Sequence, residues 1–350
     1  MNGTRPTVTV IIPARNAAAT IGACLDSIAE LSPSALDVVV ADDASTDGTG
    51  EIAAARGAVV VRLERNVGTG LARNAAARRS QGDYLAFTDA DCMVPRDWLE
   101  KFVAAMADPR YSAATGAYAG TTDPRFLPRL IDYYLRYSQQ DLHGAIESSF
   151  GSNLCVPTRD FFEAGGFPDY RLPGAPVGCF TNEDEEFAFF LVRRTGKPLQ
   201  WLRDNGVFHA YRPTLPKYFV QQAKYAESIM VSYARFPCMM KGNPSYYRGR
   251  GASSVLSAWL AIVSITLAPI RPVFLFGVAP FFVLHTGLVR YLFTVPPHPS
   301  DRLWMGFASY PFMFYQSLAW SKGLLVGAFK AVRGWCAWKN DPPVPPPLAR

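Results

Sequence analysis

The chain has 350 residues, of which 49% are hydrophobic, and a net charge of +6. This length allows one large domain or two ordinary ones. The basic residues form no tract of the nucleic-acid-binding type and the six cysteines show no CxxC spacing, so we expect no nucleic-acid partner, no zinc site and no disulfide framework.

Short β-branched runs alternate with helical segments through the N-terminal part of the chain. We predict strands at 8–12, 37–41, 58–63 and 84–88, with helices at 21–28, 50–56 and 71–80 between them. Such alternation favours a parallel sheet between two layers of helices. Because parallel strands end at one edge, where open α/β sheets bind ligands, we expect one crevice lined by Pro13, Asp42, Asp43, Arg65, Asn66, Asp89 and Asp91.

The segment from 95 to 236 is less regular. Helices are expected at 95–106, 126–140, 158–164, 182–194 and 214–236, and extended segments at 112–118, 198–203 and 206–211. The glycine- and proline-rich stretch 168–181 is a candidate lid.

Long uncharged runs dominate beyond Arg250. Runs at 251–270, 272–289 and 303–321 approach the ~20 apolar residues of a membrane span. They are flanked by arginines, as at a membrane surface: Arg248, Arg250, Arg271, Arg290 and Arg302. We predict an α/β domain at 1–245, two to three membrane-associated helices at 251–330 and a disordered proline-rich tail at 340–350. The N-terminal TRPTVTVIIPARN is a strand entering a loop, not a signal segment, so we expect the α/β domain on the cytoplasmic side.

Two carboxylates follow the hydrophobic strand in DYLAFTDADCMVP, residues 83–95. Asp89 and Asp91, at positions i and i+2, can point the same way and suit a hard divalent ion that also carries phosphate oxygens. A strand ending in DxD also opens phosphatases that use the first acid as nucleophile, although that class normally has the motif on its first strand. Asp89 as a nucleophile therefore stays an alternative.

Six segments occur in one order along the chain: VTVIIPARNAAATIGACLDSI, VVVADDASTDGT, NVGTGLARNAAA, GDYLAFTDADC, FGSN and NEDEEFAFFLVRRTG. Together they resemble the motifs of family 2 glycosyltransferases of GT-A fold, over roughly residues 7–235. The resemblance implies an α/β fold: a GT-A nucleotide-diphospho-sugar transferase domain, mainly a parallel sheet between helices, followed by a C-terminal α-helical membrane region.

The resemblance implies a donor site at the strand ends. Asp43 would recognise the base, Arg73 would contact the base or phosphates, and Pro13 would line the donor site. Asp91 would hold Mn²⁺ or Mg²⁺, and Asp89 the ribose or the metal through water. Without the resemblance, the residues after Asp43 are also good turn sequence and Arg73 is also explained as a solvated helix arginine.

The resemblance places the general base in the acidic pair that opens helix 182–194, at Asp184 with Glu183 beside it. A capping role is the other explanation, because Asn182 is a good N-cap and acids in a first turn complement the helix dipole. Near that positive helix end we expect Asp184 to stay ionised and to take the proton of an acceptor hydroxyl.

Three further positions follow from the same resemblance. His209 would be a further metal ligand, or else a structural histidine on a strand. Gly151 and Asn153 would lie on the acceptor side under the donor sugar, or else Asn153 closes a turn. Residues 221–225 match the QxxRW of processive members imperfectly, because Lys224 and Tyr225 stand where Arg and Trp would be, so processivity stays open.

These features predict a membrane-associated, inverting glycosyltransferase that uses a nucleotide-sugar donor, by family analogy a UDP-sugar. Asp184 would be the general base of a single displacement onto a polyprenyl-linked or cell-envelope glycan acceptor presented at the membrane. Two alternatives come from other classes: a phosphotransferase or phosphatase using Asp89, and a non-catalytic, membrane-tethered nucleotide-sugar binder.

Overall fold

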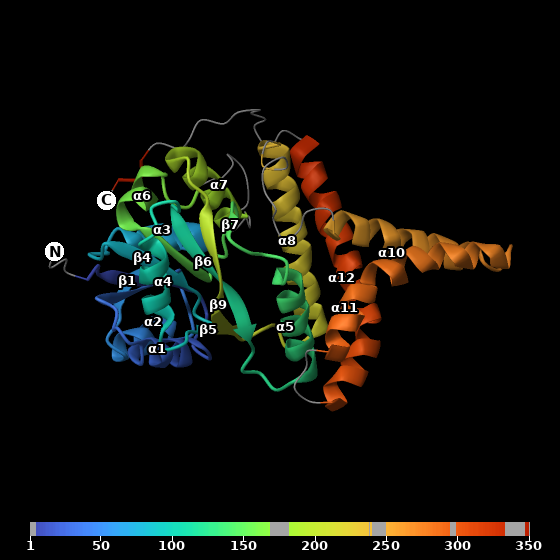
Figure 1. The fold of residues 1–350 in the computed structure, drawn as a ribbon, viewed down its shortest axis with the longest axis horizontal. Coiled ribbons are helices and arrows are strands. Elements are labelled where there is room, and N and C mark those ends of the chain that lie inside the picture. The colour runs from blue at the N-terminus through green and yellow to red at the C-terminus, as the bar shows by residue number, and fades with distance from the viewer. Residues whose placement is uncertain are drawn as a thin grey trace.

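A sheet of nine strands lies at the centre of the residues that the computed structural model describes, which are 5–168, 182–237, 239, 250–294, 299–332 and 347–349 (Figure 1). Its order is β3-β2-β1-β4-β8-β6-β9-β5, with β7 also paired to β9. The first four strands are parallel, whereas β8 runs antiparallel to β4 and β6. The strands are β1 Val8–Ala14, β2 Asp37–Asp42, β3 Val59–Arg62, β4 Tyr84–Thr88, β5 Cys92–Met93, β6 Ala113–Gly120, β7 Ala145–Ile146, β8 Asn153–Pro157 and β9 Leu199–His209.

Helices cover both faces of this sheet. The helices that accompany it are α1 Ile21–Ala29, α2 Thr49–Ala55, α3 Thr69–Ala77, α4 Trp98–Met106, α5 Phe126–Gln139, α6 Thr158–Glu163, α7 Glu183–Thr195 and α8 Leu215–Arg235. Because side chains alternate along a strand, Val10 and Ile12 pack with α1, α2 and α4 in one core, while Ile11 packs with α3, α6 and α7 in the other. All three are fully buried, and each such side chain contributes about 1.5–3 kcal/mol. The predicted α/β architecture, a mainly parallel sheet between layers of helices, is confirmed.

The strands after β4 differ in detail from the sequence prediction. The two extended segments expected at 198–203 and 206–211 are one strand, β9, whose pairing with β6 shifts register near Tyr118. A bulge of this kind interrupts the alternation of side chains between the two faces of the sheet, so the sequence of one continuous strand reads as two shorter segments. The two-residue strands β5 and β7 were not predicted, because segments this short carry no periodicity.

Among the described residues, the C-terminal part contains α10 Arg250–Leu267, the 3₁₀ helix η1 Pro272–Val278, α11 Ala279–Thr294 and α12 Pro299–Val332. They share a hydrophobic core with α5 and α8, in which Leu130 and Tyr218 meet Phe281 and Phe312. α12 approaches α8 closely, since a Cβ on Gly323 would lie 2.1 Å from the carbonyl oxygen of Ala223. The predicted boundary between an α/β domain at 1–245 and membrane-associated helices at 251–330 stays a prediction. α5 and α8, which lie before that boundary, pack with the helices after it.

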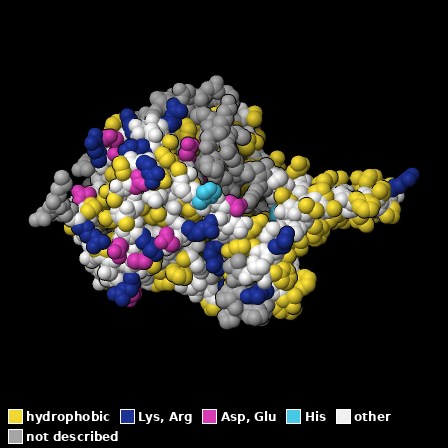
Figure 2. All heavy atoms as spheres, in the orientation of Figure 1, with side chains coloured by type: hydrophobic (Ala, Val, Ile, Leu, Met, Phe, Trp, Pro, Cys, Tyr) yellow, Lys and Arg dark blue, Asp and Glu magenta, His cyan; other side chains and the backbone are white. Residues whose placement is uncertain are grey.

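One segment of the described residues, Pro272–Thr294, is long and apolar enough to cross a membrane, and the apolar helix Ser253–Leu267 is shorter. α10 and η1 project from the body as an arm (Figure 1). Figure 2 shows that hydrophobic side chains cover most of this arm, and Leu256, Ile270 and Phe276 are each more than 70% exposed. The crossing of a membrane by one or more helices stays a prediction.

The expected disorder of the tail does not hold for residues 347–349. The Leu348 amide donates to the carbonyl oxygen of Phe162 at 2.8 Å, and Arg78 Nε donates to that of Ala349 at 3.0 Å. The rest of the tail, residues 169–181 of the predicted lid, and three of the six cysteines lie outside the described residues. The described Cys24, Cys92 and Cys155 are free and buried.

Candidate active site

A cavity of about 1130 Å³ opens at the carboxyl ends of β1, β2 and β4 and reaches across to α8. Of the predicted site residues, those that line it are Pro13, Asp43, Arg73, Asp89, Asp91, Gly151, Glu183, Asp184 and His209. Asp42, Arg65 and Asn66, which we expected in the same crevice, do not line it, and neither does Asn153. Four acids from three distant segments of the sequence, Asp43, the pair Asp89 and Asp91, and Asp184, therefore share one cavity.

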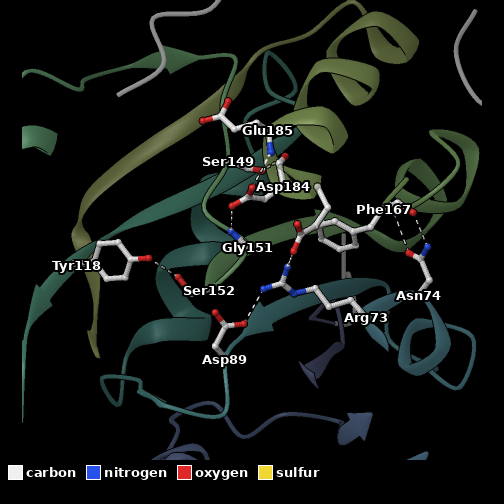
Figure 3. Close-up of polar contacts among 11 residues, drawn as sticks. Arg73, Asn74, Asp89, Tyr118, Ser149, Gly151, Ser152, Phe167, Asp184 and Glu185 are labelled. Atoms are coloured by element: carbon white, nitrogen blue, oxygen red, sulfur yellow. Dashed lines mark hydrogen bonds and ion pairs between the residues drawn. The ribbon is translucent and has the colours of Figure 1, made fainter. Parts of the chain in front are cut away.

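Arg73, on α3, is the buried cation of this cavity, with 3% of its surface exposed. Its Nη2 donates to Asp89 Oδ1 at 2.7 Å (Figure 3), and its Nη1 lies 3.6 Å from Glu183 Oε1. Its guanidinium carbon lies 5.1 Å from the centre of the Phe167 ring. Burial alone lowers the pKa of Arg73, but the charges of Asp89, Glu183 and Asp184 more than offset burial and raise it. Arg73 is thus a fixed positive charge within an acidic site, not a solvated helix arginine.

The segment that supports Arg73 was missed by sequence reasoning. Asn74 Nδ2 donates to the Phe167 carbonyl oxygen at 2.7 Å, and the Phe167 amide donates back to Asn74 Oδ1 at 2.9 Å (Figure 3). This reciprocal pair fixes the Phe167 ring against the Arg73 guanidinium. The sequence motif GLARN includes Asn74, so this residue could have been singled out. Its partner Phe167 could not, because it lies 93 positions away in the sequence.

Asp184 and Glu183 occupy the first turn of α7 and face the cavity. Asp184 Oδ2 accepts the Gly151 N–H at 3.2 Å, and its Oδ1 accepts the Glu185 N–H at 3.0 Å (Figure 3). Burial raises the pKa of Asp184, against the opposing effects of Arg73 and these donors. Burial and the Asp184 charge raise the pKa of Glu183 to about 8. Asn182 makes no side-chain capping hydrogen bond, so capping does not account for this acidic turn.

Gly151 and Asn153 have different roles from each other. A Cβ on Gly151 would lie 2.5 Å from Arg73 Nη1, so glycine is needed where this backbone meets the guanidinium. Asn153 is 1% exposed: its Nδ2 donates to the carbonyl oxygens of Ala117 and Asn205 at 2.9 and 2.7 Å, and its Oδ1 accepts the Trp98 indole N–H at 2.9 Å. The expected acceptor-side position of Asn153 is replaced by an interior one, because its amide joins three segments of the fold.

Asp91 and His209 are brought together by pairing between β5 and β9, in which Cys92 is opposite His209. His209 Nε2 lies 3.5 Å from Asp91 Oδ1, and the other ring nitrogen, Nδ1, is buried with no hydrogen-bond partner among the described residues. A carboxylate and an imidazole so placed fit a divalent transition ion such as Mn²⁺. Cys92 belongs to the same cluster, but its soft sulfur is a poorer ligand for Mn²⁺ than a carboxylate oxygen.

Asp43 ends β2 at a strained turn, since the next residue, Ala44, has a φ of 56°. Its two carboxylate oxygens accept the N–H groups of Val67 and Gly68 at 2.7 and 3.0 Å. These bonds fix the loop before α3 and leave the other lone pairs of the carboxylate towards the cavity, which Asp43 lines. Asp42 instead accepts the Ser45 N–H at 3.0 Å and takes no part in the cavity.

The opposite wall comes from α8 and the loop before it. Tyr225 is partly buried, and its hydroxyl accepts a hydrogen bond from Gln221 Nε2 at 3.2 Å. Burial raises the pKa of Tyr225, the charges of Asp184, Asp89 and Asp91 raise it further, and Arg212 opposes them. The Tyr225 phenol is therefore within the electrostatic reach of the acids and of Arg212. Arg212, Lys217 and Gln316 also line this wall and were not predicted as site residues, because their place depends on how α8 packs.

The layered sheet and the acid-lined cavity at its strand ends define the class of GT-A proteins. A solved mannosyltransferase, PcManGT from Pyrobaculum calidifontis in complex with GDP-Man and Mn²⁺, has the same fold: its TM-score is 0.54 at 21% identity, covering 94% of this chain and 88% of that one. Residues 9–163 match the family model described as Glycosyl transferase family 2. Residues 9–163 therefore belong to glycosyltransferase family 2.

Two curated relatives agree with this family. Glycosyltransferase AglE of Haloferax volcanii is 37% identical over 190 residues, which are 51% of this chain and 61% of AglE. TuaG of Bacillus subtilis, a glycosyltransferase named for teichuronic acid biosynthesis, is 39% identical over 106 residues, which are 29% of this chain and 42% of TuaG. The chain spans less than two thirds of either relative. Both relatives are named as glycosyltransferases, in agreement with the family of residues 9–163.

Proposed function

We propose that this protein is an inverting, metal-dependent glycosyltransferase that moves a sugar from a nucleotide-sugar donor, by family analogy a UDP-sugar, to a membrane-presented acceptor. The observation that carries the proposal is the convergence of Asp43, Asp89, Asp91 and Asp184 on one cavity from three separate parts of the fold: the end of β2, the turn after β4 and the first turn of α7. A sugar-nucleotide site needs such convergence, because it must hold a base, a diphosphate and an incoming hydroxyl together.

The donor would lie at the strand ends. Asp43 would accept from the base, Pro13 would line the base pocket, and Asp89, oriented by Arg73, would accept from the ribose. Asp91 and His209 would hold Mn²⁺ or Mg²⁺, with Asp89 as a further oxygen donor; the mixed carboxylate–imidazole pair favours Mn²⁺, since Mg²⁺ prefers oxygen ligands alone. When bound, the ion neutralises negative charge on a departing diphosphate.

Asp184 would be the general base. In a single displacement, the acceptor oxygen forms a bond to the anomeric carbon, the bond from that carbon to the diphosphate oxygen breaks, and the hydroxyl proton moves to the Asp184 carboxylate. The raised pKa of Asp184 makes it a stronger base than a solvated aspartate, and the Gly151 N–H holds its carboxylate in one orientation. Glu183 would assist by holding Arg73 in place.

The acceptor would be a polyprenyl-linked carrier or a cell-envelope glycan. The apolar arm of α10 and η1 supports association with a membrane, and the arginines around the apolar runs favour a catalytic domain on the cytoplasmic side of a plasma or inner membrane. The name of TuaG supports an envelope glycan.

The test is nucleoside-diphosphate release from a panel of UDP-, GDP- and dTDP-sugars, with Mn²⁺, Mg²⁺ or chelator. We expect release with one donor class only, and only with metal. Asp91→Asn should abolish turnover and weaken donor binding, whereas Asp184→Asn should keep donor binding and lose about 10²- to 10⁴-fold in kcat. Equal loss of donor binding in both variants would contradict the assigned roles, and a biological function that survives Asp184→Asn would favour a non-catalytic binder.

A further inference from the structure

The cavity has two chemically different ends. Its acids lie at the end formed by the strand termini and α7, whereas three cations, Arg212, Lys217 and Lys224, line the end formed by α8 and the loop before it. All three are exposed, and none forms an ion pair within the described part of the chain. In contrast, the cavity residues Arg73 and Arg125 are paired with Asp89 and Asp123. The α8 end therefore carries uncompensated positive charge.

The spacing along α8 places these cations on one face. Lys217, Gln221 and Lys224 are separated by four and three positions, the spacing of one helix face, and all three line the cavity. Arg212 lies two positions before the helix begins at the N-cap Thr214. Like charges brought together repel, and the arrangement is favourable once an anion lies between them.

This cationic end adjoins the acids proposed to act in catalysis. Tyr225, one turn beyond Gln221, lines the same cavity as Arg212 and Asp184, and its hydroxyl accepts a hydrogen bond from Gln221 Nε2 at 3.2 Å. A group bound by Arg212 and Lys224 would thus lie in the cavity that contains the Asp184 carboxylate. The donor diphosphate, in contrast, has its proposed place at Asp91 and His209.

The C-terminal helices close this end. Gln316 of α12 lines the cavity, accepts a hydrogen bond from the Tyr218 hydroxyl at 2.9 Å and donates one to the Tyr134 hydroxyl at 2.9 Å. The cationic wall is therefore continuous with the helices whose outer side chains are apolar (Figure 2).

We propose that Arg212, Lys217 and Lys224 bind a phosphate group of the acceptor and so select an anionic acceptor for the transfer. This inference rests on the proposed function. The phosphate could belong to the headgroup of a lipid-linked carrier or to a water-soluble sugar phosphate, since both present the same anionic oxygens to the cations.

The experiment uses the full-length protein in detergent. The triple variant Arg212→Gln, Lys217→Gln, Lys224→Gln is compared with wild type and with Lys197→Gln, which removes an exposed charge outside the cavity. Calorimetry with UDP and with GDP, each with Mn²⁺, tests the donor site. Flotation with phosphatidylcholine vesicles containing a polyprenyl phosphate, and calorimetry with glucose 1-phosphate, test the two phosphate sources. Vesicles with an equal content of phosphatidylglycerol correct for general attraction to an anionic surface.

We expect the triple variant to lose at least about tenfold in affinity for one phosphate probe, because removal of one charged hydrogen bond already has this effect. The affinity of the triple variant for nucleotide should stay within about twofold of wild type. All affinities of Lys197→Gln should also stay within about twofold of wild type. Loss for the vesicles alone identifies the lipid source, and loss for glucose 1-phosphate alone identifies the soluble source. Unchanged binding of both probes overturns the proposal, as does an equal loss of nucleotide affinity, which would assign the cations to the donor. Wild-type protein that binds neither nucleotide would instead refute the proposed function.

Discussion

Replacement of Gly151 by alanine tests the central arrangement of the site. A Cβ at this position would lie 2.5 Å from Arg73 Nη1 and 2.8 Å from its Cζ, whereas ordinary contact begins at 3.4 Å. The guanidinium must therefore move by about 0.9 Å, which would lengthen its 2.7 Å bond to Asp89 towards about 3.6 Å, beyond hydrogen-bond range. Arg73 is 3% exposed and packed on Phe167, so it has little room to adjust.

The cost follows from the bond that is lost. A hydrogen bond to a charged group contributes about 1.5–3 kcal/mol, so Gly151→Ala should lower the free energy of unfolding by about that amount. Asp89 would lose its orienting cation as well. If Asp89 acts on the donor, the same energy corresponds to a fall of roughly 10- to 100-fold in kcat/KM.

Denaturant unfolding and nucleoside-diphosphate release measure the two effects. Gly57→Ala is the matched control: its Cβ would meet nothing within 4 Å, so it should cost only the strain of its left-handed backbone, about 1–2 kcal/mol, and leave turnover unchanged. The double variant Gly151→Ala, Arg73→Lys should lose less than the sum of the single variants, because the shorter ammonium no longer meets the new methyl group. Additive losses, or wild-type stability and turnover in Gly151→Ala, would refute the reasoning.

Three further outcomes follow from the site. Burial raises the pKa of Glu183 from 4.5 to about 8, so as pH rises the folded state keeps a proton that the unfolded chain releases. The wild type should therefore lose stability relative to Glu183→Gln between about pH 4.5 and 8. A difference in melting temperature that stays constant over this range would contradict the prediction. Asn153→Ala removes three buried hydrogen bonds at about 1 kcal/mol each, so the free energy of unfolding should fall by roughly 3 kcal/mol. The KM of the folded enzyme for the acceptor should not change. A changed KM would support the acceptor-side role of Asn153. His209→Ala should weaken Mn²⁺ binding at least about tenfold, read as free Mn²⁺ by electron paramagnetic resonance, with His143→Ala, an exposed histidine outside the cavity, as the unchanged control.

The acids of the site were accessible from the sequence because each lies at the end of a recognisable element. Asp43 and Asp89 follow short hydrophobic strands, and Asp184 lies in the first turn of a predicted helix. The rule that parallel strands end at one edge was enough to bring the first two together. The same rule overreached for Asp42, since successive side chains on a strand point to opposite sides and only one of the two neighbours can face the cavity.

Local pattern thus determined the layers of the fold, the family and the identity of the acids, because hydrophobic periodicity and motif order are properties of neighbouring residues. Packing between distant segments decided the rest. The Arg73 ion pair with Asp89, the interior place of Asn153, the Asp91–His209 pair and the cations of α8 all depend on which surfaces meet across the molecule. A distance of a few ångströms between residues far apart in the chain is fixed by the summed packing of every element between them, and no single stretch of sequence contains that sum.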